Sequence, residues 1–293
     1  MIRANTGSSR IEVAVFTSTA LVQDGCRAHG LGGTSAIALG RLLTATALVG
    51  LTSKRPGVTS IQILSQSRIG QVFADVTEHG WLRGYVRNTT LNYPLILNED
   101  LEGRRTIGPA VVPGQVSVVR MGERGQYMQS ATPLRDGEVD TDVDHFLNQS
   151  DQVASVLRTD VLMSKYGDIK AAGGILVQAL PDTRLEDMQA VQSVLEGGLV
   201  TRGLREGWEA EALLESVAPG AVETDPRIVP IWRCRCSREK VLSTLNMLDA
   251  MELASMVAED RPVEVKCELC NTEHVIPLNE VEEIMKNKTS ARS

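Results

Sequence analysis

Apolar and polar residues alternate along much of the first part of the chain, and this alternation predicts β-strands. The run at 9–22 places Ile11, Val13 and Val15 on one face and Glu12 on the other. Similar runs predict strands at 58–65, 70–76, 81–87, 115–121, 126–132, 153–163 and 173–180. Several are joined by glycine-containing turns, such as the one at 122–125, so we expect antiparallel pairing with one face on helices and one on water.

The longest apolar stretch predicts a buried helix at 34–52, with Thr34 or Ser35 as its cap. It contains one charged residue, Arg41, near its middle. A central arginine costs about 2.5–3.5 kcal/mol on membrane insertion scales. We therefore expect this helix in the core of a soluble protein, with no membrane as a partner. A shorter helix is expected at 140–149, because its acidic start suits the helix dipole.

The character of the chain changes at Asp182. Apolar residues recur at helical spacing from Leu185 to Leu195 and predict an amphipathic helix that ends at Gly197-Gly198. A second helical stretch at 199–218 is broken by Gly203 and Gly207, each costing about 1 kcal/mol relative to alanine. Residues 182–225 carry ten acids and three bases, a net charge of −7 that equals that of the whole chain. We expect a metastable linker that folds only when docked, although a solvated acidic face would give the same charge pattern.

A small mixed module follows. It has predicted helices at 238–247, 249–258 and 278–286, and predicted strands at 261–266 and 275–278. The patterns together predict an α+β protein in three parts. These are an N-terminal antiparallel-sheet domain with packed helices at 1–181, an acidic helical linker at 182–226 and a small C-terminal domain at 227–293 that contains four of the five cysteines.

Composition adds three expectations. Apolar residues make up 42% of the chain and aromatic residues 3%, so the core depends on aliphatic side chains. The net charge of −7 argues against nucleic acid as the main partner. The first ten residues have no apolar signal-peptide core, and the cysteines have metal-site spacing. Both features indicate a cytoplasmic location.

Four of the five cysteines form a C-x-C and a C-x-x-C pair, separated by 30 residues. Such a pattern is typical of a tetrahedral zinc site, because each pair supplies two thiolate ligands and the intervening chain returns to close the site. We therefore predict one Zn²⁺ held by Cys234, Cys236, Cys267 and Cys270. His274 is a conceivable substitute ligand. Structural zinc contributes about 10–16 kcal/mol in finger peptides, so its loss should unfold a module of this size.

The same thiols have a second use as two local disulfides. Residues i and i+2 of an extended chain lie about 6.6 Å apart, at the long edge of the disulfide range. A bond between Cys234 and Cys236 is therefore possible but strained, and strained disulfides are the labile ones. Cys267 and Cys270 can also close on each other. The spacing suggests a switch rather than a permanent cross-link.

The fifth cysteine, Cys26, lies with His29 in a loop predicted after a turn at Asp24-Gly25. A cysteine near a histidine raises the possibility of a catalytic thiol, but no nucleophile, oxyanion-hole or nucleotide-binding motif surrounds them. We interpret Cys26 as a small packed thiol. We expect no catalytic residue and no enzyme activity.

The run Cys234-Arg-Cys236-Ser-Arg-Glu, the long gap and the run Cys267-Glu-Leu-Cys270 resemble the zinc centre of the heat-shock protein 33 family of redox-regulated chaperones. The stretches 44–54 and 167–181 also fit that family, and the likeness covers essentially the whole chain in order. Two departures are Leu269, where the family often has an aromatic residue, and the additional thiol of Cys26.

The resemblance implies an ATP-independent holdase for unfolded proteins, inactive when reduced and zinc-bound and active under oxidative stress, usually as a homodimer. Oxidation to Cys234–Cys236 and Cys267–Cys270 disulfides would release zinc and unfold the module. The linker, docked partly against that module, would then come loose. It would expose apolar residues that alternate with acids.

Two other functions remain open from the sequence. Arg233, Arg235, Arg238 and Lys240 cluster near the first cysteine pair, as in a zinc-ribbon adaptor or nucleic-acid binder, although they also suit compensation of a negative ZnS₄ centre. A C-x-x-C motif also occurs in thiol–disulfide oxidoreductases, but here it lacks a βαβ context.

Overall fold

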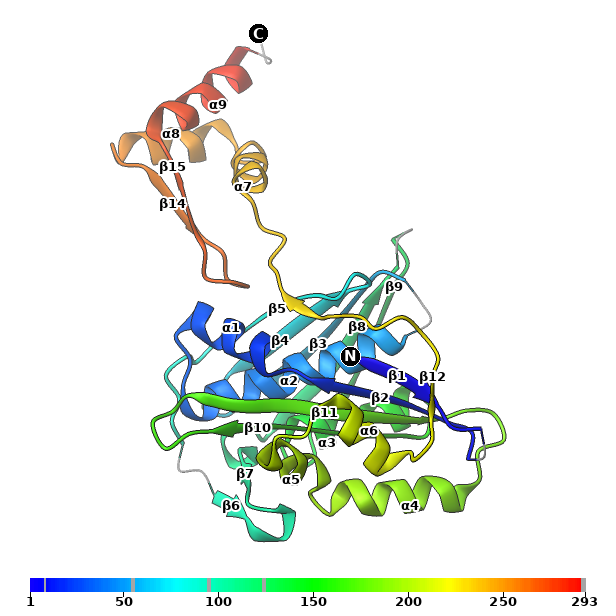
Figure 1. Cartoon of the computed structure of the whole chain (residues 1–293). Helices are drawn as coiled ribbons and strands as arrows, with labels where there is room; N and C mark the ends of the chain where they lie inside the picture. Colours follow the sequence, from blue (N-terminus) through cyan, green and yellow to red (C-terminus); the bar gives the residue numbers. More distant parts are fainter. Residues whose placement is uncertain (8, 54–55, 94–95, 123–124, 291–293) are drawn as a thin grey trace. The chain divides into compact units, whose positions relative to one another are not determined.

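The structure is a computed structural model that describes residues 1–7, 9–53, 56–93, 96–122 and 125–290 (Figure 1). The chain forms two compact units, Met1–Arg233 and Cys234–Ser293. Residues 182–226 therefore belong to the first unit. The mixed architecture confirms the predicted α+β class.

The first unit contains a five-stranded sheet in which every pair is antiparallel. Its strands, in spatial order, are β10 (Ser155–Met163), β11 (Ile169–Ala179), β2 (Ile11–Thr17), β1 (Ile2–Asn5) and β12 (Val222–Glu223). Val13 and Val15 of β2 contribute to one apolar cluster, and Ala14 and Phe16 to another. Both faces of this sheet are therefore buried, so the expectation of one face on water was wrong for this sheet.

A six-stranded sheet lies in the same unit. Its strands, in spatial order, are β13 (Ile231–Trp232), β5 (Trp81–Val86), β4 (Gln71–Thr77), β3 (Val58–Ser65), β8 (Gly114–Met121) and β9 (Tyr127–Pro133). The predicted antiparallel strands are present with ends shifted by at most one residue, and β13 adds to them in parallel beside β5. The predicted turn at 122–125 lies partly outside the described residues. The short hairpin of β6 (Ile96–Asn98) and β7 (Arg104–Thr106) carries too little pattern to be predicted.

Helix α2 (Gly33–Thr52) lies between the two sheets, and it contacts strands of both (Figure 1). It is long and apolar enough to cross a membrane, but 94% of its most apolar window is buried inside the protein. The predicted helix is therefore confirmed as the centre of the core, but the predicted cap was wrong, because the N-cap is Gly32 and no side chain caps the helix. Helix α3 (Val139–Phe146) packs beside it and continues into a π-helical turn at Leu147–Asp151.

The prediction for residues 18–29 was wrong. The strand ends at Thr17, and helix α1 (Thr19–His29) includes the expected turn and loop. Gly25 is not a turn residue. A Cβ there would lie 3.1 Å from both Leu43 and Trp232, so glycine permits close helix packing. Val22 and Cys26, four residues apart, are buried on the same helical face.

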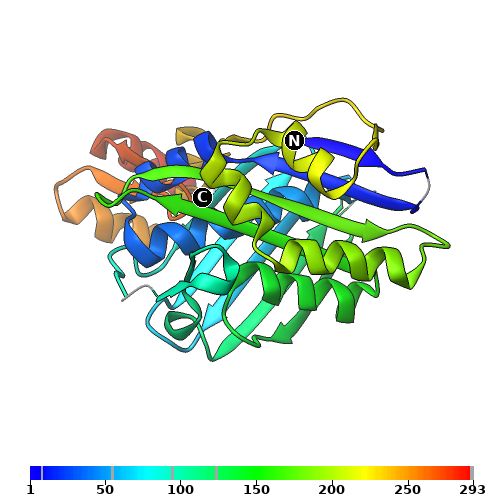
Figure 2. The same ribbon diagram turned by 60° about the horizontal axis from the view of Figure 1, so that its bottom comes forward.

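The predicted linker forms three helices, α4 (Leu185–Glu196), α5 (Leu199–Glu206) and α6 (Ala210–Val217). Gly198 precedes α5 as its N-cap and Gly207 ends it, with φ of +79° and +76°, which glycine adopts at low cost. Gly203 does not break α5, contrary to our prediction. A Cβ there would come within 2.7 Å of Leu213, so the glycine lets α6 approach. Figure 2 shows the helices along the five-stranded sheet.

The second unit matches the predicted order of elements. Its elements are α7 (Arg238–Leu245), α8 (Ala250–Ala258), β14 (Val263–Lys266), β15 (Glu273–Ile276) and α9 (Leu278–Ser290). Asp249 and Glu252 form a capping box at the start of α8. The buried apolar residues in the core of this unit are Leu245, Leu253, Ile276 and Val281.

Candidate metal centre

The four predicted cysteines come together in the second unit. Cys234 and Cys236 precede α7, and Cys267 and Cys270 lie in the turn between β14 and β15. This turn is tight because the Asn271 N–H donates to the Cys267 carbonyl at 2.7 Å, with Asn271 itself at φ +62°. The loop therefore directs both of its thiols toward the first pair.

The sulfur geometry fits one metal ion. All four Sγ atoms lie within 4.8 Å of one another. Cys234 Sγ lies 3.8 Å from Cys267 Sγ, and Cys236 Sγ lies 3.4 Å from Cys270 Sγ. A tetrahedral zinc site with Zn–S bonds of about 2.3 Å requires sulfur–sulfur distances of about 3.8 Å. The four cysteines therefore form a possible metal-binding site whose dimensions suit zinc.

The electrostatics of the cluster also favour a cation. Burial raises the pKa of the Cys236 thiol, and hydrogen bonds to Cys270 and Cys234 raise it further. Burial and the neighbouring thiols likewise raise the pKa of Cys267, although a backbone hydrogen bond from Leu269 opposes the shift. Four thiolates this close repel one another, and a divalent cation at the centre would reverse that penalty.

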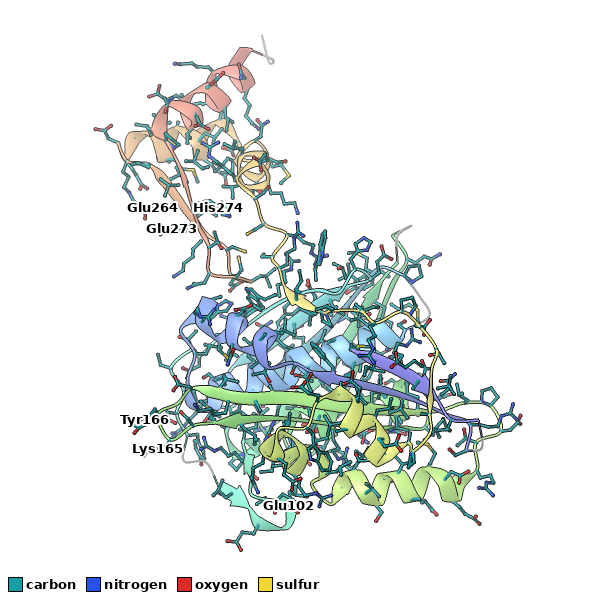
Figure 3. The ribbon with its side chains drawn as sticks, in the orientation of Figure 1. Glu102, Lys165, Tyr166, Glu264, Glu273 and His274 are labelled. Atoms are coloured by element: carbon teal, nitrogen blue, oxygen red, sulfur yellow. The ribbon has the colours of Figure 1, made fainter. Side chains whose placement is uncertain are left out.

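Two other candidate residues lie outside the cluster. His274, labelled in Figure 3, is on β15, and within the described residues it is not a member of the metal-binding group. Cys26 is buried in α1 of the first unit, 3.9 Å from the Ala36 carbonyl, and burial raises its pKa to about 12. A thiol with so little thiolate is a packed side chain and a poor nucleophile.

The basic residues near the first cysteine pair are largely engaged in structural contacts. Arg233 stacks on Trp81 with its guanidinium carbon 4.1 Å from the ring centre, within the first unit. In the second unit, Arg238 pairs with Glu280 at 2.6 Å, and Lys240 Nζ donates to the Arg235 carbonyl. These contacts give the basic residues a structural role that does not require nucleic acid.

A second candidate site is the interface between the linker helices and the five-stranded sheet. It is a continuous cluster of buried apolar side chains from both sides. The linker contributes Met188, Val191, Leu195, Leu199, Val200, Leu204, Leu213, Leu214 and Ala218. The sheet contributes Ile2, Ala4, Ile11, Val13, Val15, Val156, Ile175 and Val177. Separating the two would expose one large apolar surface on each.

The sequence did not reveal a buried ionic cluster beneath this interface. Arg41, fully buried on α2, contacts Glu138 Oε2 at 2.5 Å and Asp160 Oδ1 at 2.8 Å. Thr201 of α5 donates its hydroxyl to Asp160 Oδ2 at 2.7 Å. This buried hydrogen bond ties the linker to the core, in addition to more exposed contacts such as the one between Arg158 and Glu196 at 3.0 Å. The only sequence signal was the charge of Arg41 in an apolar helix.

The cluster remains charged because its opposite charges compensate for burial. Burial alone would raise the pKa of Asp140, but Arg104 at 2.6 Å and Arg41 outweigh it and lower that pKa. The same carboxylates raise the pKa of Arg104 against the effect of burial. Removing one charged residue of such a group leaves its partner as an unpaired charge in the interior, which is strongly destabilising.

Comparison with known proteins gives a consistent result. The model of the family described as "Hsp33 protein" matches residues 1–277. The "33 kDa chaperonin" of Staphylococcus carnosus is 30% identical over 271 residues, 92% of this chain and 90% of that protein. The one from Desulfotalea psychrophila is 30% identical over 272 residues, with the same coverage. The crystal structure of the "33 kDa chaperonin (Heat shock protein 33 homolog)" of Thermotoga maritima superposes with a TM-score of 0.87 and 26% identity over 98% of each chain.

Proposed function

The chain belongs to the Hsp33 family of chaperones, and from that premise we propose that it is a redox-regulated, ATP-independent holdase of the cytoplasm. The observation that carries the proposal is the approach of four cysteine sulfur atoms to within 4.8 Å of one another. The relatives are named as chaperonins, in agreement with a binding rather than a catalytic role.

In the reduced state, Cys234, Cys236, Cys267 and Cys270 would hold Zn²⁺. The ion would keep all four sulfurs as thiolates and would supply much of the stability of the second unit. The small core of this unit supports that role, because few apolar side chains are fully buried there.

Peroxide would convert the four thiolates into two disulfides. A thiolate sulfur attacks a peroxide oxygen and breaks the O–O bond, which gives a sulfenic acid and hydroxide. The neighbouring thiolate of the same pair then attacks that sulfur and displaces hydroxide, which forms the S–S bond. Each pair of thiolates gives up two electrons to one peroxide, and the two hydroxide ions that form become two waters after protonation. With Cys234–Cys236 and Cys267–Cys270 formed, no thiolate ligand remains for the metal.

Loss of the metal would unfold the second unit and weaken the hold of the linker. Cys234 follows Trp232, the last residue of β13, after a single intervening residue. A change of backbone at Cys234 would therefore act first on β13, which follows the linker in sequence. Release of α4–α6 would expose the apolar face of the five-stranded sheet and the apolar sides of the helices.

The exposed surfaces would bind unfolded clients by hydrophobic contact. The acidic residues of the linker would keep the complexes soluble, since net charge opposes association between complexes. The family resemblance supports a homodimer as the active form.

The test compares the reduced zinc protein with the peroxide-treated protein. We expect the oxidised protein alone to suppress aggregation of a chemically denatured client. In parallel, four thiols and one zinc ion per chain should be lost together. Equal suppression in both states would defeat the switch, and zinc release without loss of thiols would defeat the proposed chemistry. A Cys26→Ser variant should behave as the unmodified protein in both assays.

A further inference from the structure

Two short strands from the C-terminal half of the first unit close the edges of its two sheets. Strand β12 pairs with β1 at the edge of the five-stranded sheet, and β13 pairs with β5 at the edge of the six-stranded sheet (Figure 1). The Thr224 N–H donates to the Arg3 carbonyl at 3.0 Å, and the Arg233 N–H donates to the Leu82 carbonyl at 2.7 Å. Each cover strand is only two residues long.

These covers lie on the segment that connects the linker helices to the cysteines. Strand β12 follows α6. Strand β13 ends at Trp232, and Arg233 is the one residue between it and Cys234. Short pairings of this kind contribute few hydrogen bonds. They are therefore the first part of each sheet to open when the flanking chain becomes disordered.

The hydrogen-bonding direction of each edge alternates along the strand. In β1, Arg3 and Asn5 turn their main-chain groups toward β12, while Ala4 lies between them and turns toward β2. In β5, Leu82 turns outward to the cover strand, and Arg87 just beyond β5 donates inward to Gln71 at 2.8 Å. By the same alternation Gly84 and Val86 point outward, beyond the two-residue register of β13.

We propose that release of β12 and β13 turns β1 and β5 into acceptor strands that bind extended segments of unfolded client polypeptides by strand addition. The proposal rests on the proposed function, because it needs oxidation to free the covering segment. Main-chain donors and acceptors are common to every unfolded polypeptide. An open strand edge therefore suits a chaperone that must bind many sequences.

The surroundings of the β1 edge suit such a client. Ile2 and Ala4 are buried in the same apolar cluster as Leu213 and Leu214 of α6. Departure of α6 with β12 would leave an apolar face beside an open edge. A client strand added to β1 could then place every second side chain on that face, while its backbone pairs with Arg3 and Asn5.

Strand β9 provides an internal comparison. It is the opposite edge of the six-stranded sheet, and no strand among the described residues pairs with its outer side. Tyr127 and Met128 on it are 61% and 51% exposed. Because this edge is not covered by the linker, client binding there would not depend on oxidation.

The first experiment measures amide hydrogen exchange residue by residue in the full-length protein when reduced, oxidised and oxidised with a carboxymethylated, permanently unfolded polypeptide. We expect Arg3, Asn5 and Leu82 to lose protection on oxidation and to regain it with client, by about tenfold or more in rate. Gly84 and Val86 should gain protection with client. The inward amides of Ala4 and Arg83 should stay protected throughout.

The second experiment uses the unmodified oxidised protein and two synthetic decapeptides of the same β-prone sequence. One is N-methylated at alternate residues, so it keeps its side chains but loses the donors along one edge. We expect the methylated peptide to bind at least about tenfold more weakly.

The outcomes separate this proposal from the holdase function. Oxidised protein that fails to suppress aggregation contradicts the holdase function itself. Suppression of aggregation with unchanged exchange at the outward amides, or with equal binding of the two peptides, overturns strand addition alone. Client-dependent protection confined to β9 in both redox states also overturns it.

Discussion

At the scale of single residues, Asp144 of α3 links the stability of the first unit to pH. Burial raises its pKa to about 6, although Arg158 lies 2.8 Å away and favours the charged form. A carboxyl with a higher pKa in the folded than in the unfolded protein keeps its proton longer when folded. Its contribution to stability is therefore full below about pH 4 and is lost as the pH rises through about 6.

We predict that the free energy of unfolding falls by roughly 2–3 kcal/mol between about pH 4 and pH 6 because of this group. Asp144→Asn should lack that part of the pH dependence and keep an acceptor for Arg158. Urea unfolding of both proteins at half-unit steps from pH 4 to 7 measures the difference, with exposed Asp168→Asn as the control. Parallel curves for the normal and Asp144→Asn proteins would show that Asp144 does not titrate in this range.

Thr201 is the residue whose loss should loosen the linker most selectively. Thr201→Val keeps the shape of the side chain but leaves buried Asp160 Oδ2 without the hydroxyl that donates to it. An unsatisfied buried acceptor costs about 1–3 kcal/mol. We predict faster amide exchange across 199–206 in the reduced protein, measured by mass spectrometry, while Thr201→Ser exchanges at the normal rate. Identical exchange in the two variants would show that this hydrogen bond does not stabilise the docked linker.

Individual residues differ in how far the sequence could place them. The cysteine pairs were identifiable because each half of the site has a short, local spacing. The chain needs only to bring the two pairs together around one metal ion. The partners of Arg41 were not, since Glu138 and Asp160 lie 97 and 119 residues away in sequence. Nothing in a local pattern connects residues so far apart.

At the scale of elements, the apolar side of α6 should control how tightly the linker is held. Leu213 is fully buried in the interface with the sheet, and Val194 on α4 is 44% exposed. Leu213→Ala removes buried apolar volume and should cost about 2–5 kcal/mol. An exposed substitution such as Val194→Ala usually stays within about 0.5 kcal/mol.

We predict that Leu213→Ala suppresses client aggregation at lower peroxide than the unmodified protein, because less free energy holds the linker in place. Val194→Ala should follow the unmodified protein. The measurement is a peroxide titration of aggregation by light scattering. If both variants respond at the same peroxide level, the interface does not set the threshold.

Long elements with a clear period were predicted well, and close packing decided the failures. Helix α2 and most long strands follow their apolar patterns. Helix α1 was missed because its short apolar run fits a strand as well as a helix. Gly25 and Gly203 look like breakers in sequence, but each admits a side chain from a neighbouring element that a Cβ would exclude. The sequence pattern does not show which distant residue will pack against each glycine.

At the scale of the whole molecule, the division into two compact units predicts that metal removal unfolds the second unit and leaves the sheets of the first unit folded. The metal would contribute about 10–16 kcal/mol, comparable to the total stability of a typical domain at about 5–15 kcal/mol. We predict that a zinc chelator in reducing buffer makes 234–293 sensitive to protease. The sheets and α2 of Met1–Arg233 should remain resistant.

Limited proteolysis with mass analysis of the fragments checks this prediction. Cys270→Ser should show the chelated pattern without chelator, and Cys26→Ser should show the normal one. An unchanged fragment pattern after the metal has been stripped would mean that the second unit is ordered by its own core.

The second unit consists of one uninterrupted stretch of chain, from Cys234 onward, with its helices and its hairpin adjacent in sequence. Contacts between residues close in sequence form quickly, on the scale of microseconds to milliseconds for small helical domains. Thiol–disulfide exchange takes seconds to hours. Refolding of the second unit would therefore be timed by the supply of reductant and metal rather than by a slow folding step within the unit.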